Sequence, residues 1–410
     1  MRILVCAINF APESVGAGKY TSELCIWLAS LGHDVRVVTA PPWFPEWRIP
    51  KEFRGFVPRH EIWHGLRVIR VPICVPSRSS ALNRMALAAS FAAFSLPQLA
   101  KLSFWRPQLV WIIAPSLAST PGALACARMT RAATWLHVQD FEIDVAFELG
   151  LLRGGVLRRL ALALESNLLR RFDRVSSISE RMLAKLHRKG VAAERTFLLP
   201  NWVDVDFIRP MQHPGLYRDE LGIGPEAIVA LYSGSMGVKQ GLDFLAAAAH
   251  RLKDAPNIHF VFCGQGPGLS GLAAACQGLP NIHWLPLQPA HRLCELLNLA
   301  DIHLLPQRVD AADLVLPSKL VGMLASGRPI VTNAAADTTL AELVSQCGVV
   351  VAPDDVRGIA LAIESLAASS GMRQSLGARG REIAVRSFST SHIFGKLADE
   401  LRHLEMAVTA

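Results

Sequence analysis

The chain has 410 residues, of which 51% are hydrophobic and 19% charged, and its net charge is +8. This composition is that of a soluble globular protein, and the length exceeds one comfortable hydrophobic core, so we expect two domains of about 200 residues each. The charge is uneven: residues 1–200 carry 26 Lys and Arg against 14 Asp and Glu, a net +12, whereas the remainder is net −4. The first half is therefore predicted to face an anionic partner.

Anionic lipid is the favoured partner. Aromatic residues do not interleave with a Lys/Arg stripe, and no helix-turn-helix or zinc-finger spacing occurs, which disfavours nucleic acid. The eight scattered cysteines form no CxxC pair and are typical of reduced, buried thiols in a cytosolic protein. The N-terminal run MRILVCAINF indicates a first strand rather than a signal peptide.

The first half begins with a strand, a helix and a strand at residues 3–8, 20–31 and 34–39, joined by a turn that contains Gly16 and Gly18. No third glycine follows at the dinucleotide-binding spacing and no acidic residue ends the second strand, so a nicotinamide dehydrogenase is disfavoured. The two glycines permit close backbone approach to a ligand, although an ordinary turn explains them as well.

Residues 60–63 and 67–71 are expected to form a hairpin-like pair, and residues 82–104 an apolar helix with basic ends at Arg84, Lys101 and Arg106. Only 16 uncharged residues lie between Arg84 and Lys101, and Pro97 interrupts them, so we expect no membrane-spanning helix. The segment can lie in a lipid interface or be buried within its domain.

A polar cluster follows the strand expected at residues 133–138. It contains His137, Asp140, Glu142 and Asp144, and ligands of open parallel sheets bind at such strand ends. Its spacing matches no metal site; the cluster could position substrate hydroxyls, shuttle a proton, or form a satisfied loop network. The pair at Asp204 and Asp206 could suggest a metal site, but an interdomain loop is a poor place to hold one.

The second half repeats the α/β pattern. The strand expected at 227–233 leads into a glycine-rich turn with Ser235, Gly237 and Lys239, and the strand at 258–263 leads to Gly266. Residues 313–331 predict a loop, a short helix from residue 319 to 325 and a buried strand, and the helix opens with Ser318 and Lys319. Free amides, a hydroxyl and an ammonium at one helix start attract anions, so these loops together predict a diphosphate site.

The motifs resemble those of the retaining glycosyltransferases of the GT-B fold, sequence family four. They include SLGHDVRVVT, SSISE, PNWVD, GQGP, LADIHLLP and PSKLVGMLASGRPIV, and they span nearly the whole chain in the family's order. FAPESVGAGKY, TAPPWFP and HVQDFEID look like the subgroup of colanic-acid fucosyltransferases and O-antigen N-acetylfucosaminyltransferases. The resemblance implies two Rossmann-like domains, with acceptor binding in 1–203 and nucleotide-sugar binding in 204–386, and a helix at 387–410 that packs back toward the first.

The resemblance also implies roles for individual residues. Positive charge from two lysines would stabilise the leaving diphosphate, His137 and Asp140 would hold the donor sugar, and Glu13 with the Gly16–Gly18 turn would line the acceptor side. No metal and no cofactor are expected. The implied set comprises catalytic Lys239, Lys319, His137 and Asp140; donor-binding Gly16, Gly18, Ser235, Gly237, Gly266, Pro317, Ser318 and Leu320; and, for donor sugar or acceptor, Glu13, Glu142, Asp310, Asp313 and Leu314.

One departure concerns two glutamates that the family commonly has before its AxG turn. Aligned on Gly327, their positions are Leu314 and Gly322, and neither is acidic. Ribose and sugar recognition would therefore be arranged differently, with Asp310 or Asp313 as a substitute for the first glutamate.

The implied activity is transfer of a sugar, best assigned as L-fucose or N-acetyl-L-fucosamine, from a nucleoside diphosphate to a polyprenyl-diphosphate-linked saccharide in bacterial surface polysaccharide synthesis. The basic first half would hold the protein on the cytoplasmic face of the plasma membrane. Two alternatives are a hydrolysing sugar-nucleotide epimerase of the same fold and a non-catalytic sugar-nucleotide-binding protein.

Overall fold

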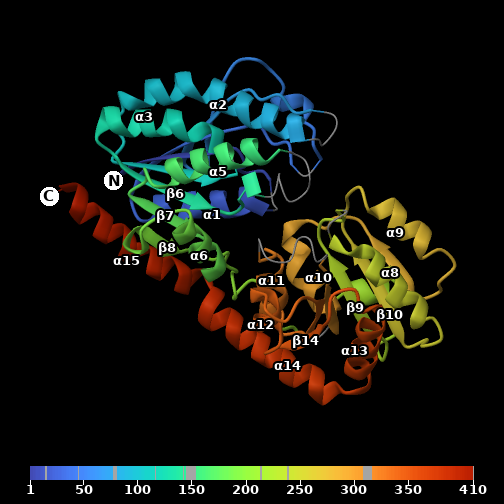
Figure 1. The fold of residues 1–410 in the computed structure, drawn as a ribbon. Coiled ribbons are helices and arrows are strands. Elements are labelled where there is room, and N and C mark those ends of the chain that lie inside the picture. The colour runs from blue at the N-terminus through green and yellow to red at the C-terminus, as the bar shows by residue number, and fades with distance from the viewer. Residues whose placement is uncertain are drawn as a thin grey trace. The chain divides into compact units, whose positions relative to one another are not determined.

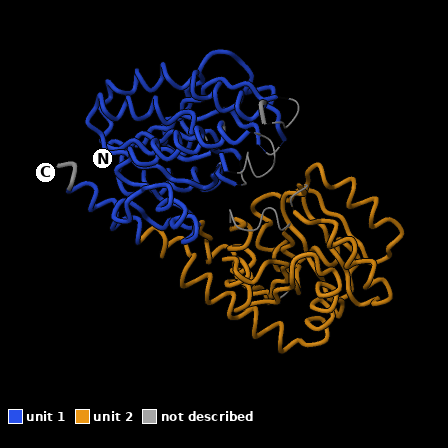
Figure 2. Tube along the Cα trace, viewed as in Figure 1, with its two compact units in different colours: residues 1–200, 396–410 blue, residues 201–395 orange. Residues whose placement is uncertain are grey.

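The chain forms two compact units. The computed structural model describes residues 1–13, 16–44, 46–76, 81–115, 117–141, 143–144, 154–212, 215–237, 240–307 and 316–409. Unit 1 comprises Met1–Pro200 with Lys396–Ala410, and unit 2 comprises Asn201–Gly395 (Figure 2). Each unit contains its own largely parallel sheet flanked by helices, which confirms the predicted pair of doubly wound α/β domains (Figure 1).

The sheet of unit 1 has the strand order β3-β4-β2-β1-β5-β6-β7-β8, and its pairings are parallel except for the β3–β4 hairpin. Its central strands are long apolar runs because both faces are covered. The chain order reverses between β1 and β5, which makes their carboxyl ends the switch point of this sheet. The strands are β1 (Arg2–Ala7), β2 (Asp34–Thr39), β3 (Arg59–Trp63), β4 (Leu66–Arg70), β5 (Leu109–Ala114), β6 (Ala133–Val138), β7 (Arg174–Ser177) and β8 (Thr196–Leu198).

The helices predicted at residues 20–31 and 82–104 are present in unit 1 as α1 and α2. Helix α2 packs beside α3, and Figure 1 shows the two lying next to each other over the sheet. The helices are α1 (Gly16–Ser30), α2 (Ala81–Ser103), α3 (Thr120–Thr130), α5 (Gly155–Leu169) and α6 (Glu180–Arg188), and α15 (Thr390–Thr409) enters this unit at Lys396.

The helix predicted at residues 82–104 is confirmed as α2, which continues through Pro97 over 23 residues. Proline removes one helix hydrogen bond, and Ala93, whose carbonyl loses its partner, is exposed to water. By length and composition alone, residues Asn83–Ser103 could cross a membrane, and a third of their most apolar stretch is buried. The core helix of a soluble protein passes the same test, although such a helix is mostly buried.

The prediction that all eight cysteines are reduced and buried is confirmed only in part. All eight thiols are free, and six are buried, but Cys74 is exposed and Cys294 is half-buried.

The sheet of unit 2 is parallel throughout, in the order β11-β10-β9-β12-β13-β14. The chain moves outward from β9 to β11 and then returns to β12 on the other side of β9, so the switch point lies between β9 and β12. The strands are β9 (Ile228–Ser233), β10 (Ile258–Cys263), β11 (Ile282–Leu285), β12 (Ile302–Leu305), β13 (Ile330–Asn333) and β14 (Gly348–Val351).

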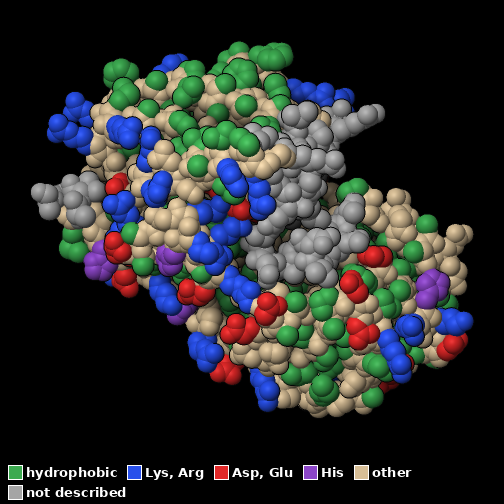
Figure 3. Space-filling model, viewed as in Figure 1, with side chains coloured by type: hydrophobic (Ala, Val, Ile, Leu, Met, Phe, Trp, Pro, Cys, Tyr) green, Lys and Arg blue, Asp and Glu red, His purple; other side chains and the backbone are tan. Residues whose placement is uncertain are grey.

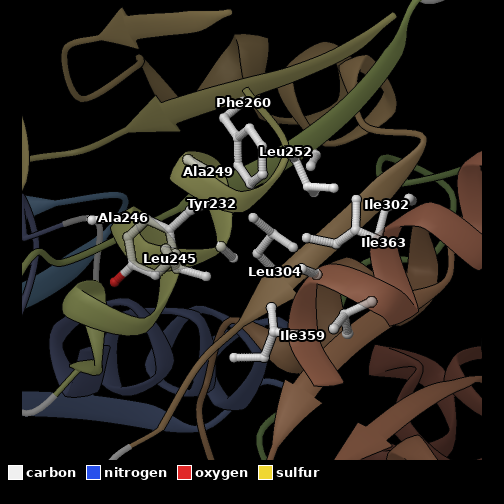
Figure 4. Packing of buried hydrophobic residues seen from close by; sticks show 14 of the residues in the cluster. Tyr232, Leu245, Ala246, Ala249, Leu252, Phe260, Ile302, Leu304, Ile359 and Ile363 are labelled. Atoms are coloured by element: carbon white, nitrogen blue, oxygen red, sulfur yellow. The ribbon is translucent and has the colours of Figure 1, made fainter. Parts of the chain in front are cut away.

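The core of unit 2 lies on both faces of this sheet. Ile228, Ala230 and Tyr232 of β9 enter the cluster beneath α8 and α13, whereas Val229 and Leu231 enter a second cluster with residues of α7 and α10. Figure 4 shows the first cluster, with Tyr232 beside Leu245 and Ala246 of α8. Successive side chains of a strand point to opposite faces, so β9 is buried on both sides.

The helices of unit 2 include four short ones, α7, α9, α10 and α12, that the apolar periodicity did not indicate. Helices of four to seven residues do not complete two helical turns, so their apolar pattern is weak. The helices are α7 (Tyr217–Glu220), α8 (Leu242–Arg251), α9 (Leu269–Ala275), α10 (Leu293–Leu299), α11 (Leu320–Ala325), α12 (Thr339–Val344), α13 (Val356–Ala368) and α14 (Ser370–Ile383), followed by a π-helical turn at Ala384–Phe388.

Candidate functional site

Two glycine-containing loops at the carboxyl ends of β9 and β10 are joined by backbone hydrogen bonds. Gly234 N–H donates to Cys263 O (2.9 Å), Met236 N–H to Gln265 O (2.9 Å) and Gly268 N–H to Met236 O (2.8 Å). A β-carbon on Gly264 would lie 1.9 Å from Gly234 O, so the close approach requires glycine there. The backbones of the two loops therefore form one surface beside the switch point.

Gly264→Ala should disrupt this surface. The backbone of Gly264 has φ +147°, and the added methyl group would overlap the Gly234 carbonyl, so the two loops must separate. We expect at least a ~10-fold loss of nucleoside diphosphate affinity by calorimetry, or about 1.4 kcal/mol. Gly271→Ala on α9 is the matched control, since nothing lies within 4 Å of its added β-carbon and affinity should stay unchanged.

Lys319 reaches over the first of these loops from the residue before α11. A methyl group on Gly234 would lie 3.4 Å from Lys319 Cδ and 3.9 Å from Nζ, so the lysine stem occupies the space that this glycine leaves open. The amine sits 4.0 Å from the centre of the Tyr232 ring, and Tyr232 Oη donates to Ser235 O at 2.6 Å. The structure thus brings Lys319, Ser235 and the β9 strand end together at the switch point of unit 2.

The Lys319 amine is buried, and no described residue accepts a hydrogen bond from it. Burial lowers the pKa of Lys319 to about 7, because a charged ammonium loses hydration that the Tyr232 ring replaces only in part. A buried amine with unused hydrogen-bond donors is suited to an anion, which would supply the missing acceptors and counter-charge.

Leu320, which the sequence predicts to bind the donor, belongs to the core of unit 2. Its side chain is fully buried, and its N–H donates to Pro317 O at 3.0 Å, so this amide closes a turn. Pro317 and Ser318 lie in the same turn and are half-buried. Gly237, in the loop after β9, is also half-buried. A β-carbon on Gly266 would lie 2.6 Å from Met236 O, so Gly266 serves the joining of the two loops.

At the position of the family's second glutamate this chain has Gly322, and the structure gives that glycine a role in packing. Gly322 lies in α11, and a β-carbon there would approach Leu297 Cδ1 of α10 to 3.3 Å, which is a tight contact between the helices. Five predicted residues lie outside the described ranges: Lys239, Glu142, Asp310, Asp313 and Leu314.

In unit 1 the Glu13 carboxylate holds a neighbouring loop. It accepts hydrogen bonds from the N–H groups of Trp43 and Phe44, both at 3.0 Å, and from Asn9 Nδ2 at 2.8 Å. A β-carbon on Gly18 would lie 2.8 Å from Glu13 Cβ, so this glycine lets α1 pack against the glutamate. Gly16, at φ +61°, lies near the ring of Phe44. These contacts account for Glu13 and Gly18 as parts of the loop that follows β1.

His137 is buried near the carboxyl end of β6. Its Nδ1 lies 2.9 Å from Ser176 Oγ, which also accepts from Trp135 Nε1 at 2.8 Å. The Ser176 hydroxyl can therefore donate to Nδ1 and leave the imidazole proton on Nε2. Burial lowers the pKa of His137 to about 3, so the ring is neutral at physiological pH. A neutral imidazole can orient a hydroxyl group but adds no charge.

The segment after β6 is held by an ion cluster that the sequence reading missed. Lys189 Nζ pairs with Glu165 of α5 and, at 2.9 Å, with Asp144, and Lys185 pairs with Asp144 at 3.2 Å. Both lysines lie over the ring of Phe141. This cluster fixes residues on the C-terminal side of the half-buried Asp140.

The Asp204–Asp206 segment forms a turn. Asp204 Oδ1 accepts from the N–H groups of Asp206 (3.0 Å) and Phe207 (2.9 Å), which gives the carboxylate a local structural use.

Comparison with known proteins identifies the family. Residues 15–202 match the model of the glycosyl transferase 4-like domain and residues 227–369 that of glycosyl transferases group 1. The chain is 37% identical to WcaI of Escherichia coli (strain K12), named as a colanic acid biosynthesis glycosyl transferase, over 98% of this chain and all of the relative.

Solved structures show the same fold. Sucrose-phosphate synthase from Thermosynechococcus elongatus superposes with a TM-score of 0.77 at 17% identity, covering 99% of this chain and 100% of that one. HepE from Anabaena, in complex with UDP-glucose, gives a TM-score of 0.70 at 16% identity, covering 98% and 100%. The chain therefore belongs to family four of the retaining GT-B glycosyltransferases.

Proposed function

We propose that this glycosyltransferase moves a 6-deoxy sugar, L-fucose or N-acetyl-L-fucosamine, from a nucleoside diphosphate to a polyprenyl-diphosphate-linked saccharide. The acceptor would belong to bacterial exopolysaccharide or O-antigen synthesis. The observation that carries the donor part of the proposal, the binding of a diphosphate, is the buried Lys319 amine, without a described hydrogen-bond acceptor, at the switch point of unit 2. The similarity to WcaI supports the polysaccharide context.

The chemistry assigned to unit 2 is stabilisation of the leaving group. The bond between the anomeric carbon and the diphosphate oxygen breaks with its electron pair on that oxygen, and the Lys319 ammonium would offset the developing charge. The acceptor oxygen then bonds to the anomeric carbon on the same face, and its proton passes to the departing phosphate oxygen. No metal is required in this scheme. Lys239 is proposed as the second cation, and His137 and Asp140 remain predictions for holding the donor sugar.

Lys319 should change its protonation when donor diphosphate binds. With a pKa of about 7, roughly nine in ten of these amines are neutral at pH 8, and a nearby anion raises the pKa, so binding should take up a proton. Calorimetric titration with nucleoside diphosphate at pH 8, in two buffers of different ionisation enthalpy, measures that uptake. Lys319→Met should abolish it; an equal uptake in the variant would assign the proton to another group.

Membrane attachment is proposed through unit 1, on the cytoplasmic face of the plasma membrane. Helix α2 exposes Met85, Phe94 and Leu96, and Phe104 follows it at 87% exposure. Figure 3 shows hydrophobic side chains gathered over α2. Helix α5 exposes Val156, Leu160 and Leu164 at four-residue spacing, with Arg158 and Arg159 between them. Apolar helix faces with basic neighbours suit an anionic lipid interface.

Charge reversal at Arg84, Lys101 and Arg106 should weaken this attachment. Each basic residue near an anionic surface contributes about 1 kcal/mol, so replacing all three by Glu should lower vesicle partitioning at least ~100-fold. Sedimentation with phosphatidylglycerol vesicles measures the effect. Partitioning like that of the wild type would count against attachment through α2.

A donor panel tests the activity itself. Purified protein in detergent and EDTA, with a polyprenyl-diphosphate-linked N-acetylhexosamine, is offered GDP-fucose, UDP-N-acetylfucosamine, UDP-glucose and UDP-N-acetylglucosamine in turn. Acceptor-dependent release of nucleoside diphosphate from one deoxy-sugar donor is the expected result. Release without acceptor would favour the epimerase, and binding of a donor with no turnover would favour the non-catalytic protein.

A further inference from the structure

A cavity of about 490 Å³ opens at the β3–β4 edge of the unit 1 sheet, beneath the end of α2. Cations from three elements line it, namely Arg36 of β2, Arg67 of β4 and Lys101 of α2, together with His60. Ile62, Val68, Ile69 and Leu102 give it apolar walls. The strand ends carrying His137 and Glu13 contribute no lining residue, so the cavity is distinct from the candidate site.

The cations of this cavity lack close carboxylate partners among the described residues, although the Arg36 guanidinium lies over the Trp105 ring, 4.2 Å from its centre. Arg36 and Arg67 are partners in the parallel β2–β4 register, so two guanidinium groups leave neighbouring strands on one face. Within the described residues, no carboxylate lies within ion-pair distance of Arg36, Arg67 or Lys101, and Arg36 Nε is buried without an acceptor. The one acid in the lining, Glu61, pairs with Arg70 at 2.7 Å and Arg59 at 3.4 Å, and Asp34 nearby accepts from Trp105 Nε1.

Gln98 supplies an independent observation. Its side chain lines the cavity and is only 5% exposed, yet none of the described residues hydrogen-bonds to it. Solvent reaches the oxygen and nitrogen of its amide, and because Gln98 lines the cavity, we take these atoms to face it. The Gln98 amide, which is open to the cavity, and the buried Nε–H of Arg36 are donors for which the described residues supply no acceptor, and an anion in the cavity would supply one.

We propose that this cavity binds the phosphate ester of an anionic phospholipid headgroup. Guanidinium groups match phosphate oxygens in geometry and charge, and the Gln98 amide and Lys101 add further donors. Phe94 lies one turn before Gln98 on α2 and Phe104 follows Lys101 by three residues, both exposed, and Ile62 on the rim is also exposed. Apolar residues around a cationic cavity complement acyl chains around a phosphate, which favours a lipid over a free phosphate ester.

This inference deepens the proposed membrane attachment by giving it a specific site, and it is independent of the sugar that is transferred. The probe is sedimentation of the full chain with vesicles of phosphatidylglycerol in phosphatidylcholine at 0.1 M salt. Arg36→Gln/Arg67→Gln removes two charges from the cavity, and Arg128→Gln/Arg188→Gln removes two exposed charges elsewhere in unit 1. Arg67→Gln alone, on an exposed residue, covers the case in which the double variant fails to fold.

We expect the cavity variant to lose at least ~10-fold more vesicle affinity than the charge-matched control, while donor turnover in detergent is retained. Equal losses in the two variants would overturn the site and leave only general charge attraction. Soluble glycerol 3-phosphate is titrated in parallel. Binding of it as tight as that of the vesicle headgroup would overturn the lipid assignment and leave a site for a free phosphate ester. Wild-type protein that binds vesicles through the cavity but turns over none of the donors would instead count against the proposed enzyme function.

Discussion

Lys319→Met is expected to lower kcat by about 10²–10³-fold, or ~2.7–4 kcal/mol, which is the usual effect of removing one group that stabilises transition-state charge. Methionine can fill the same space over Gly234 and the Tyr232 ring. It also removes a buried amine without a described hydrogen-bond acceptor, so the melting temperature should be unchanged or higher. Loss of turnover without loss of stability would separate a role in the reaction from a role in the fold.

The matched control is Lys253→Met, which removes an exposed lysine from the same unit. Its kcat and KM should equal those of the wild type. Steady-state kinetics with the donor found in the panel give both values. A Lys319→Met enzyme within threefold of wild-type kcat would contradict the assignment of the leaving-group cation, whatever its effect on KM.

The sequence was a good guide wherever local patterns decide the structure. The central strands are apolar runs because both faces of each sheet are covered, and the glycine-rich turns follow β9 and β10 because parallel strands place their loops at one edge. The position of Lys319 beside the β9 loop could also be predicted, since a helix that begins with Ser-Lys is a local signal of an anion-binding loop.

The contacts between distant segments could not be predicted in this way. The bonds from Trp43 and Phe44 to Glu13 span about 30 residues, and the close packing of Gly322 on Leu297 joins two helices. The sequence reading treated Glu13 as a ligand contact and Gly322 as the loss of one. At both positions the structure shows a packing role that is visible only when the tertiary structure is known, and the assignment of Glu13 to the acceptor side stays a prediction.

The ion cluster after β6 shows the same limit, and it leads to the largest expected change in stability. Lys189→Met leaves Glu165, whose carboxylate is fully buried, without its cation. Breaking a buried pair typically costs 3–5 kcal/mol, which corresponds to a fall in melting temperature of roughly 6–20 °C for a unit of about 200 residues. Lys185→Met is the matched control on the preceding turn: it faces the same Phe141 ring and Asp144 but leaves Glu165 paired, so its cost should be much smaller.

The pH dependence identifies the unpaired carboxylate as the cause. Burial already raises the pKa of Glu165, and loss of Lys189 removes the strongest interaction that lowers it. A raised carboxyl pKa costs stability above that pKa and costs nothing once the group is protonated in both states, so the deficit should shrink as the pH falls from 7 toward 5. Adding Glu165→Leu should recover most of the loss at pH 7, because the buried charge is then absent. A deficit independent of pH, or one that the second substitution does not relieve, would show that Lys189 stabilises the segment through packing on Phe141 and its bond to Asp144 instead.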